Sequence, residues 1–236
     1  MKKTTAAALI IGSFAILALL PAMADESSPD MSDPTAVYTS VGVGYGTKGH
    51  NLKFGIQLPD SGEGSAHMIS LESKEGGDTY RGRYFKLNTT TGFASSIDAN
   101  YNRLTGVAQV SAGGLQTIPI TDQFTIYPSL YLGTMIANER NDAGDKVGVY
   151  FPAITATALL YTKYQFTENV WLNVNPSFTS SVYGSKTDVF DLEASLGYQF
   201  TPVLNMRLFH NNNMSVGTYN DDTYESVTRL EFNYAL

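Results

Sequence analysis

Val227-Thr228-Arg229-Leu230-Glu231-Phe232-Asn233-Tyr234-Ala235-Leu236 decides the fold, because apolar and polar side chains alternate along this stretch. Successive side chains of a β-strand face opposite sides. One face therefore carries Leu230, Phe232, Tyr234 and Leu236, and the other carries Arg229, Glu231 and Asn233. A half-buried strand of a soluble sheet fits this pattern. A membrane β-barrel also fits it, with the apolar face in lipid and the polar face in the lumen.

The N-terminal residues favour the membrane barrel, because they form an export signal. A basic start, Met1-Lys2-Lys3, precedes an apolar run over residues 6–20 and a small-x-small site, Ala22-Met23-Ala24. These are the parts of a secretory signal peptide. The run is shorter than the roughly 20 residues that a membrane anchor helix needs. We therefore expect residues 1–24 to be a signal peptide that is cleaved after Ala24.

Composition restricts how an exported chain of this kind can fold. No later apolar stretch is long enough for a transmembrane helix, so only a closed barrel would satisfy the backbone inside a membrane. Cysteine is absent, so disulfides are not expected to hold the fold. Without Lys2 and Lys3, 13 basic side chains remain against 22 acidic ones, a net charge of −9. That balance predicts no affinity for nucleic acid.

Strand patterns fill the rest of the chain. Residues 25–34 are polar, and we expect a short disordered periplasmic lead there, followed by a barrel over residues 35–236. Twelve strands of about 10 residues leave roughly seven residues for each connection, whereas eight strands leave about 17, which is longer than any polar stretch. Twelve is the expected count, with ten or eight as alternatives. The predicted strands are 37–45, 52–58, 65–73, 79–87, 93–101, 105–118, 124–136, 147–164, 170–178, 190–200, 203–211 and 224–236.

The predicted connections alternate between short turns and longer polar loops. The turns at 119–122, 166–169 and 201–202 are flanked by aromatic residues. Rings beside short turns are typical of the aromatic girdle at a periplasmic membrane interface. The predicted girdle consists of Tyr164, Phe166, Trp171, Tyr198, Phe200 and Tyr234. The polar connections at 137–146 and 212–223 are expected to be external loops.

With its export signal, alternating strands and C-terminal apolar strand, the chain resembles the Gram-negative outer-membrane β-barrel proteins of the porin-like superfamily. The resemblance implies a transmembrane, antiparallel, up-and-down β-barrel in the outer membrane. It also implies contact with outer-membrane lipids and with the barrel assembly machinery, which recognises the last strand. One departure is that the superfamily usually ends in Phe, whereas Leu236 stands here.

Several charged side chains fall on the predicted inward faces. Three successive strands carry Asp191 and Glu193, then Arg207, then Arg229 and Glu231, which predicts one mixed-sign cluster. Lys53 and Asp98 are expected to join it in lining the lumen. Charges inside a membrane protein pair with one another or line a water path. Two interpretations stay open, because a twelve-stranded barrel lies between the filled and the open sizes. The charges either stiffen a filled lumen or tune a small hydrophilic channel.

Enzymatic patterns are weak. Outer-membrane lipid hydrolases use a His-x-Ser pair on a strand, but Asn212 stands where the nucleophile would follow His210. An aspartate pair at Asp221 and Asp222 is better explained as a solvated loop. That pair, or Asp142 with Asp145, would at most form a loose calcium site. We therefore predict no enzyme, no catalytic residues, no metal site and no cofactor.

The sequence thus predicts a small porin-like channel for hydrophilic solutes, or a structural barrel. The alternative is a surface interaction or adhesion barrel that acts through its external loops. A barrel lipid hydrolase ranks below both.

Overall fold

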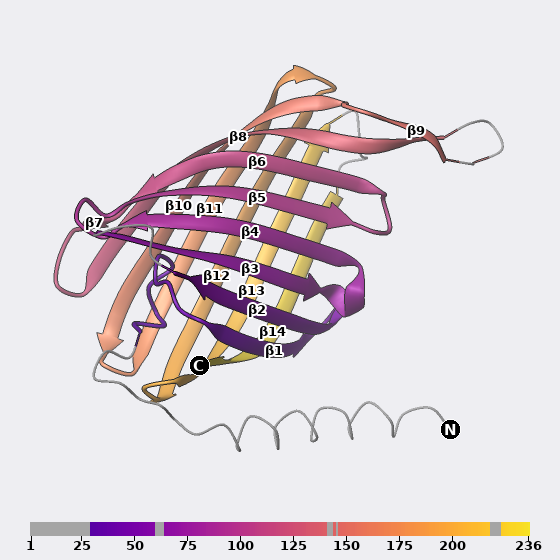
Figure 1. Cartoon of the computed structure of the whole chain (residues 1–236). Helices are drawn as coiled ribbons and strands as arrows, with labels where there is room; N and C mark the ends of the chain where they lie inside the picture. Colours follow the sequence, from indigo (N-terminus) through magenta and orange to yellow (C-terminus); the bar gives the residue numbers. More distant parts are fainter. Residues whose placement is uncertain (1–28, 60–63, 141–143, 145, 218–222) are drawn as a thin grey trace, which may run out of the picture.

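A single antiparallel sheet rolls into a closed barrel in the computed structural model, which describes residues 29–59, 64–140, 144, 146–217 and 223–236. Each long strand pairs with its neighbours along the chain, β8 pairs with β10, and β1 closes the ring against β14 (Figure 1). The strands of the ring are β1 (Ser40–Gly46), β2 (Gly49–Leu58), β3 (Ser65–Lys74), β4 (Thr79–Asn88), β5 (Phe93–Asn102), β6 (Val107–Gln116), β8 (Phe124–Arg140), β10 (Ala153–Thr167), β11 (Val170–Gly184), β12 (Thr187–Thr201), β13 (Leu204–Gly217) and β14 (Thr223–Ala235).

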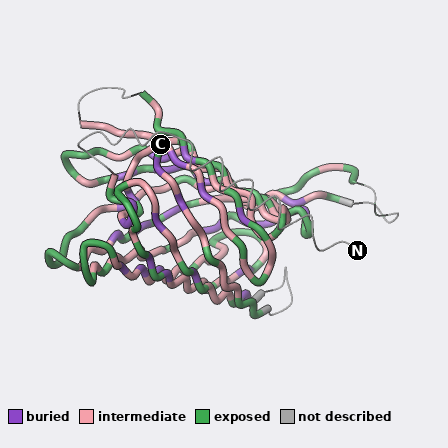
Figure 2. The backbone as a smooth tube through the Cα atoms, turned by 90° about the horizontal axis from the view of Figure 1, so that it is seen from below, coloured by how far each residue is buried: buried purple, intermediate pink, exposed green. Residues whose placement is uncertain are grey.

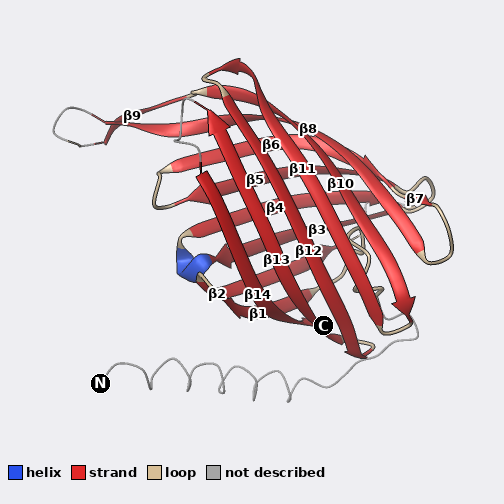
Figure 3. Cartoon of the chain, turned by 180° about the vertical axis from the view of Figure 1, so that it is seen from behind, coloured by secondary structure: helices blue, strands red, loops and turns tan. Residues whose placement is uncertain are grey.

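These twelve strands confirm the expected count. Two short strands lie outside the ring: β7 (Ile118–Pro119) and β9 (Lys146–Tyr150), both paired with β8. The predicted strand 147–164 is therefore two strands, β9 and β10. They separate at Phe151 and Pro152, and a proline there cannot donate a ladder hydrogen bond. A single 3₁₀ turn, η1 (Glu75–Gly77), joins β3 to β4 (Figure 3). No helix among the described residues is long and apolar enough to cross a membrane.

The two faces of the sheet differ in polarity, as the alternation predicts. Outward apolar side chains are open to the surroundings: Phe54 is 51% exposed, Ile97 53% and Leu130 62%. Inward polar neighbours such as Asn51 and Asp98 are buried. Buried and exposed residues accordingly alternate along the strands in Figure 2. An apolar outer surface with a polar interior is the arrangement of a transmembrane barrel.

Two mouths open at the ends of the barrel. The terminal mouth is the end where β1 begins and β14 finishes, with Ser40 paired to Ala235. The short turns between β10 and β11 and between β12 and β13 lie at this end. The opposite mouth carries η1 and the β8–β9 hairpin, which projects beyond the other strands (Figure 1).

Residues 29–39 lie inside the terminal mouth, contrary to the expected disorder of residues 25–34. Met31, Ser32 and Thr35 are all buried. An apolar cluster on the inner wall lies beside them, built from Phe85, Ala94, Leu115 and Tyr127, with Val37 packed against it. The polar composition of the segment predicted solvation, but the barrel interior supplies polar partners of its own. Residues 25–28 of the expected lead lie outside the described residues.

Candidate functional site

The lumen contains two polar cavities, of about 380 and 160 Å³. The larger lies toward the opposite mouth, with Lys48, Glu75 and Gln109 in its wall. The smaller lies toward the terminal mouth, with Ser32, Pro34 and Glu231 in its wall. Five charged side chains line both cavities: Lys74, Arg81, Arg83, Glu193 and Arg229. This shared ring is the candidate functional site, and we call it the waist.

Three members of the predicted charge cluster meet at one side of the waist. Arg229 donates from Nε to Glu231 Oε1 at 2.6 Å and from Nη2 to Glu193 Oε2 at 3.0 Å. Glu193 lies on β12, Arg229 and Glu231 lie on β14, and β13 runs between these two strands. The strand register brings the three residues together, because all three side chains face the lumen. Asn51 on β2 donates a longer hydrogen bond, 3.4 Å, to Glu231. Charge-assisted bonds of this kind fix the guanidinium against the wall.

Asp98 lies on a different part of the wall from that group. Its carboxylate accepts from Arg83 Nε at 2.9 Å and from Arg81 Nε at 3.0 Å, both on neighbouring β4. Arg83 also donates to the Tyr161 hydroxyl on β10, at 3.4 Å. Arg81 and Arg83 were missing from the predicted lining, because the facing of 79–87 was ambiguous from sequence.

Lys53 pairs locally as well, with a residue that the sequence analysis did not place in the lumen. Its Nζ lies 3.7 Å from Glu72 Oε1 on β3, and Lys74 Nζ lies 2.9 Å from the other oxygen of Glu72. A single carboxylate therefore lies between two lysines. The alternation of Glu72 and Lys74 with apolar Leu71 was the sequence pattern that could have revealed this group.

Asp191 and Arg207 have polar rather than charged partners among the described residues. The Asp191 carboxylate accepts from the Asn211 amide. Arg207 Nη2 donates to Asn173 Oδ1 and to Ser195 Oγ, each at 3.0 Å. The guanidinium carbons of Arg207 and Arg229 lie 4.6 and 4.1 Å from the centre of the Phe209 ring. Cation–π contact of this kind orients a guanidinium without neutralising it. The predicted single cluster is therefore several separate groups along the wall.

Most of the aromatic residues expected in a girdle lie on the outer surface near the terminal mouth. Tyr164 and Phe166 are in edge contact at 5.0 Å between ring centres, and Tyr198 and Phe200 at 4.9 Å. Tyr234 has the same outward parity, opposite Val41. Trp171 does not belong with them. It is only 1% exposed and has the inward parity of Asn173. It fits there because Gly197 stands opposite, where any Cβ atom would overlap the indole ring.

The described residues that were considered for catalysis, His210 and Asn212, line neither cavity. His210 Nδ1 lies 2.8 Å from Thr228 Oγ1 on an exposed position of the barrel. Asn212 accepts a hydrogen bond from the Tyr224 hydroxyl at 2.7 Å. Asp142, Asp145, Asp221 and Asp222 lie outside the described residues, as does part of both expected external loops. Within the described part of the chain, no group of three or more potential metal ligands occurs.

Comparison with known proteins identifies the architecture. No family model matches the sequence. No curated protein matches it. The NanC porin superposes with a TM-score of 0.61 at 10% identity, over 84% of this chain and 100% of that chain. The fold is that of the outer-membrane porins.

Two further porin-fold structures support this assignment. The COG4313 outer membrane channel from Pseudomonas putida F1 gives a TM-score of 0.56 at 7% identity, over 89% of this chain and all of that chain. The KdgM porin, in complex with disordered oligogalacturonate, gives 0.53 at 9% identity, over 85% and 99% of the two chains. Identities this low establish the fold alone. The apolar outer belt around a polar lumen agrees with this fold.

Proposed function

We propose that this barrel is a channel through which small hydrophilic solutes diffuse across the outer membrane. The observation that carries the proposal is the pair of polar cavities that share the waist. A volume of 380 Å³ lies at the lower end of the range for small-molecule sites. Solutes larger than a small sugar or an amino acid are therefore not expected to pass.

The direction of the ion pairs supports a channel over a filled lumen. Asp98 on β5 pairs with Arg81 on the neighbouring β4. Glu72 on β3 pairs with Lys74 on the same strand and with Lys53 on β2. Glu193 on β12 pairs with Arg229 on β14, two strands away. These ion pairs run along the wall, and Arg83 also makes a longer bond of 3.4 Å to Tyr161 on β10, four strands further around the ring. Charged groups that bond to their own wall leave the centre for water and solute.

The balance of charge limits the selectivity of the channel. The two cavities are lined by seven basic and six acidic side chains, counting Lys48 and Glu75 at the opposite mouth. Because the signs nearly cancel, we expect only weak preference between small cations and anions. No catalytic role is proposed, since His210 is exposed and lines neither cavity of the lumen.

The outer face defines the partners that we propose. Its apolar belt is expected to contact outer-membrane lipids, with the rings near the terminal mouth at the interface. The barrel assembly machinery is expected to act on β14, whose outward face carries Leu230, Phe232 and Tyr234.

Planar-bilayer recording of purified, refolded protein tests the channel. We expect discrete conductance steps in potassium chloride and a reversal potential close to zero in a salt gradient. An empty vector preparation, refolded in the same detergent, is the control for contaminating porins. A folded wild-type protein that gives no steps would overturn the proposed function.

A further inference from the structure

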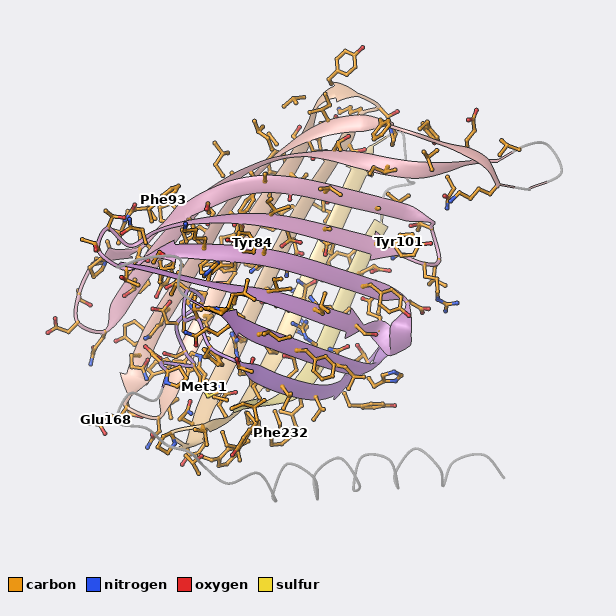
Figure 4. The ribbon with its side chains drawn as sticks, in the orientation of Figure 1. Met31, Tyr84, Phe93, Tyr101, Glu168 and Phe232 are labelled. Atoms are coloured by element: carbon orange, nitrogen blue, oxygen red, sulfur yellow. The ribbon has the colours of Figure 1, made fainter. Side chains whose placement is uncertain are left out.

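The segment Pro29–Thr39 fills part of the terminal mouth and is held there by side chains from two sides of the barrel. Met31 is 4% exposed and Thr35 is 4% exposed, although the segment is otherwise polar. Figure 4 shows Met31 among the side chains at the end of the barrel where Glu168 and Phe232 also lie. Burial to this extent indicates a docked segment.

One side of the mouth holds the segment by polar contacts. Lys163 on β10 forms an ion pair with Asp30. Gln165, two residues further along β10, lies with Oε1 3.3 Å from the Ser32 hydroxyl oxygen. Gln199 on β12 donates from Nε2 to Met31 Sδ at 3.4 Å. All three wall residues point into the lumen close to the ends of their strands.

The other side of the mouth holds the segment by apolar contact. Val37 packs against the cluster of Phe85, Ala94, Leu115 and Tyr127, which come from β4, β5, β6 and β8. The backbone is then fixed at Thr39, whose carbonyl accepts from the Leu236 amide at 2.9 Å. Its hydroxyl accepts from the Gln57 amide at 3.1 Å. The segment thus contacts a continuous part of the wall, from β4 through β8 and β10 to β12, and is fixed to the β1 edge.

The segment also forms part of the solute path. Ser32 and Pro34 line the 160 Å³ cavity together with waist residues such as Arg81 and Arg229. A solute that moves from the waist to the terminal mouth must therefore pass directly beside them.

We propose that residues 29–39 are the constriction of this channel and set its unit conductance and its upper solute size. The proposal rests on the channel function above and adds the element that limits it. The solutes that pass are then those that fit between the segment and the β13–β1 wall, where Gly42 and Gly44 keep side-chain volume low.

Deletion of residues 29–37, with the signal peptide and residues 25–28 retained, tests the constriction in planar bilayers. We expect unit conductance to rise about twofold or more, and larger neutral sugars to permeate in liposome swelling, because the narrowest part of the path widens. Steps of equal size in the deletion variant and the wild type would overturn the constriction and leave the channel function standing. No steps in either protein would overturn both. Steps in the deletion variant alone would support the segment as a complete seal and overturn channel activity of the native protein.

A full-length variant guards against a folding defect in the deletion. Asp30→Asn with Val37→Ser removes the ion pair and the apolar anchor while keeping the chain length. We expect a conductance between those of the wild type and the deletion. Glu225→Gln is the matched control, because it removes an exposed ion pair with Lys48 at the opposite mouth, 2.6 Å long. Wild-type conductance in the double variant, with circular dichroism showing intact β structure, would also reject the constriction.

Discussion

Single charged residues determine the electrostatics of the lumen, because each carboxylate neutralises particular bases on its own part of the wall. Asp98 is the clearest case, since it is the ion-pair partner of both Arg81 and Arg83. The ratio is reversed at Arg229, which pairs with both Glu193 and Glu231. Loss of Asp98 therefore exposes two positive charges to a passing ion, whereas loss of either glutamate leaves Arg229 with one partner.

Asp98→Asn is expected to shift ion selectivity toward anions, because two arginines lose their neutralising partner. The measurement is the reversal potential in a tenfold potassium chloride gradient. Asp188→Asn is the matched control, since Asp188 bonds to Ser180 outside the cavity linings. An equal shift in both variants, or none in Asp98→Asn, would contradict the assigned pairing.

Acid is expected to loosen the N-terminal segment through Asp30. Burial opposes ionisation of this carboxyl, but hydrogen bonds from Lys163 and Ser32 outweigh it, so the pKa of Asp30 lies below its usual value. A lowered pKa means that docking is stabilised above the usual Asp value of about 4 and is lost as pH falls below it. Asp33, Tyr38, Tyr127, Lys163 and Arg207 are other titratable or charged groups around the segment.

Conductance recorded between pH 6 and pH 3 tests whether acid loosens the N-terminal segment through Asp30. We expect it to increase below pH 4 in the wild type. The Asp30→Asn variant should start higher and increase less, because lumen acids contribute equally to both proteins. Identical pH profiles would show that Asp30 does not hold the segment.

At the scale of the strand, period-two alternation predicted much but not everything. It placed β14 correctly, with Arg229 and Glu231 inward, and it located all twelve strands. It failed on β4, where Arg83 and Phe85 share the inward face although one is charged and the other apolar. The reason is physical: the inner wall changes from polar at the waist to apolar beside Val37. A face that crosses both environments has no uniform polarity to detect.

Trp171 shows a second limit of strand patterns. An aromatic ring beside a short turn is typical of the membrane interface. The Trp171 ring, however, lies on the inward face of β11. The deciding neighbour, Gly197, is distant in sequence, and only the register of β11 on β12 brings the two together. The N-terminal segment escaped prediction for the same reason, since its partners Lys163 and Gln199 lie far along the chain.

Gly197→Val is expected to destabilise the barrel by about 2 kcal/mol, because the new side chain overlaps the buried Trp171 ring. The measurement is the urea unfolding midpoint of the protein refolded into lipid vesicles. Gly82→Ala is the control on the outer face, where a Cβ atom would lie 3.5 Å from Leu71, an ordinary contact. A stable Gly197→Val protein would contradict the packing of this strand pair.

The whole molecule is a barrel with an apolar outer face and a polar inner face. Its stability depends on apolar side chains facing lipid and polar side chains facing the lumen. Leu130, which is 62% exposed on the outside of β8, is expected to lie in the hydrocarbon region. Gln109, which lines the larger cavity, faces water. The same substitution should therefore have opposite outcomes at these positions.

Leu130→Arg is expected to cost about 2–4 kcal/mol of unfolding free energy if the residue lies near the bilayer midplane. Gln109→Arg should fold normally and change only ion selectivity. Both are measured by folding yield and by urea titration in vesicles. Equal tolerance of the two variants would mean that the outer belt does not contact lipid.

The closure of the ring between β1 and β14 imposes an order on the assembly of this protein. Residues 29–39 are joined to β1, and their contacts come from β4 to β8 on one side and from β10 and β12 on the other. Because the segment leaves the sheet at β1, it lies near β10 and β12 only once β1 has closed against β14. The segment therefore settles late, and its burial marks a barrel that has finished forming. A barrel arrested before that moment would have a wider opening at its terminal mouth.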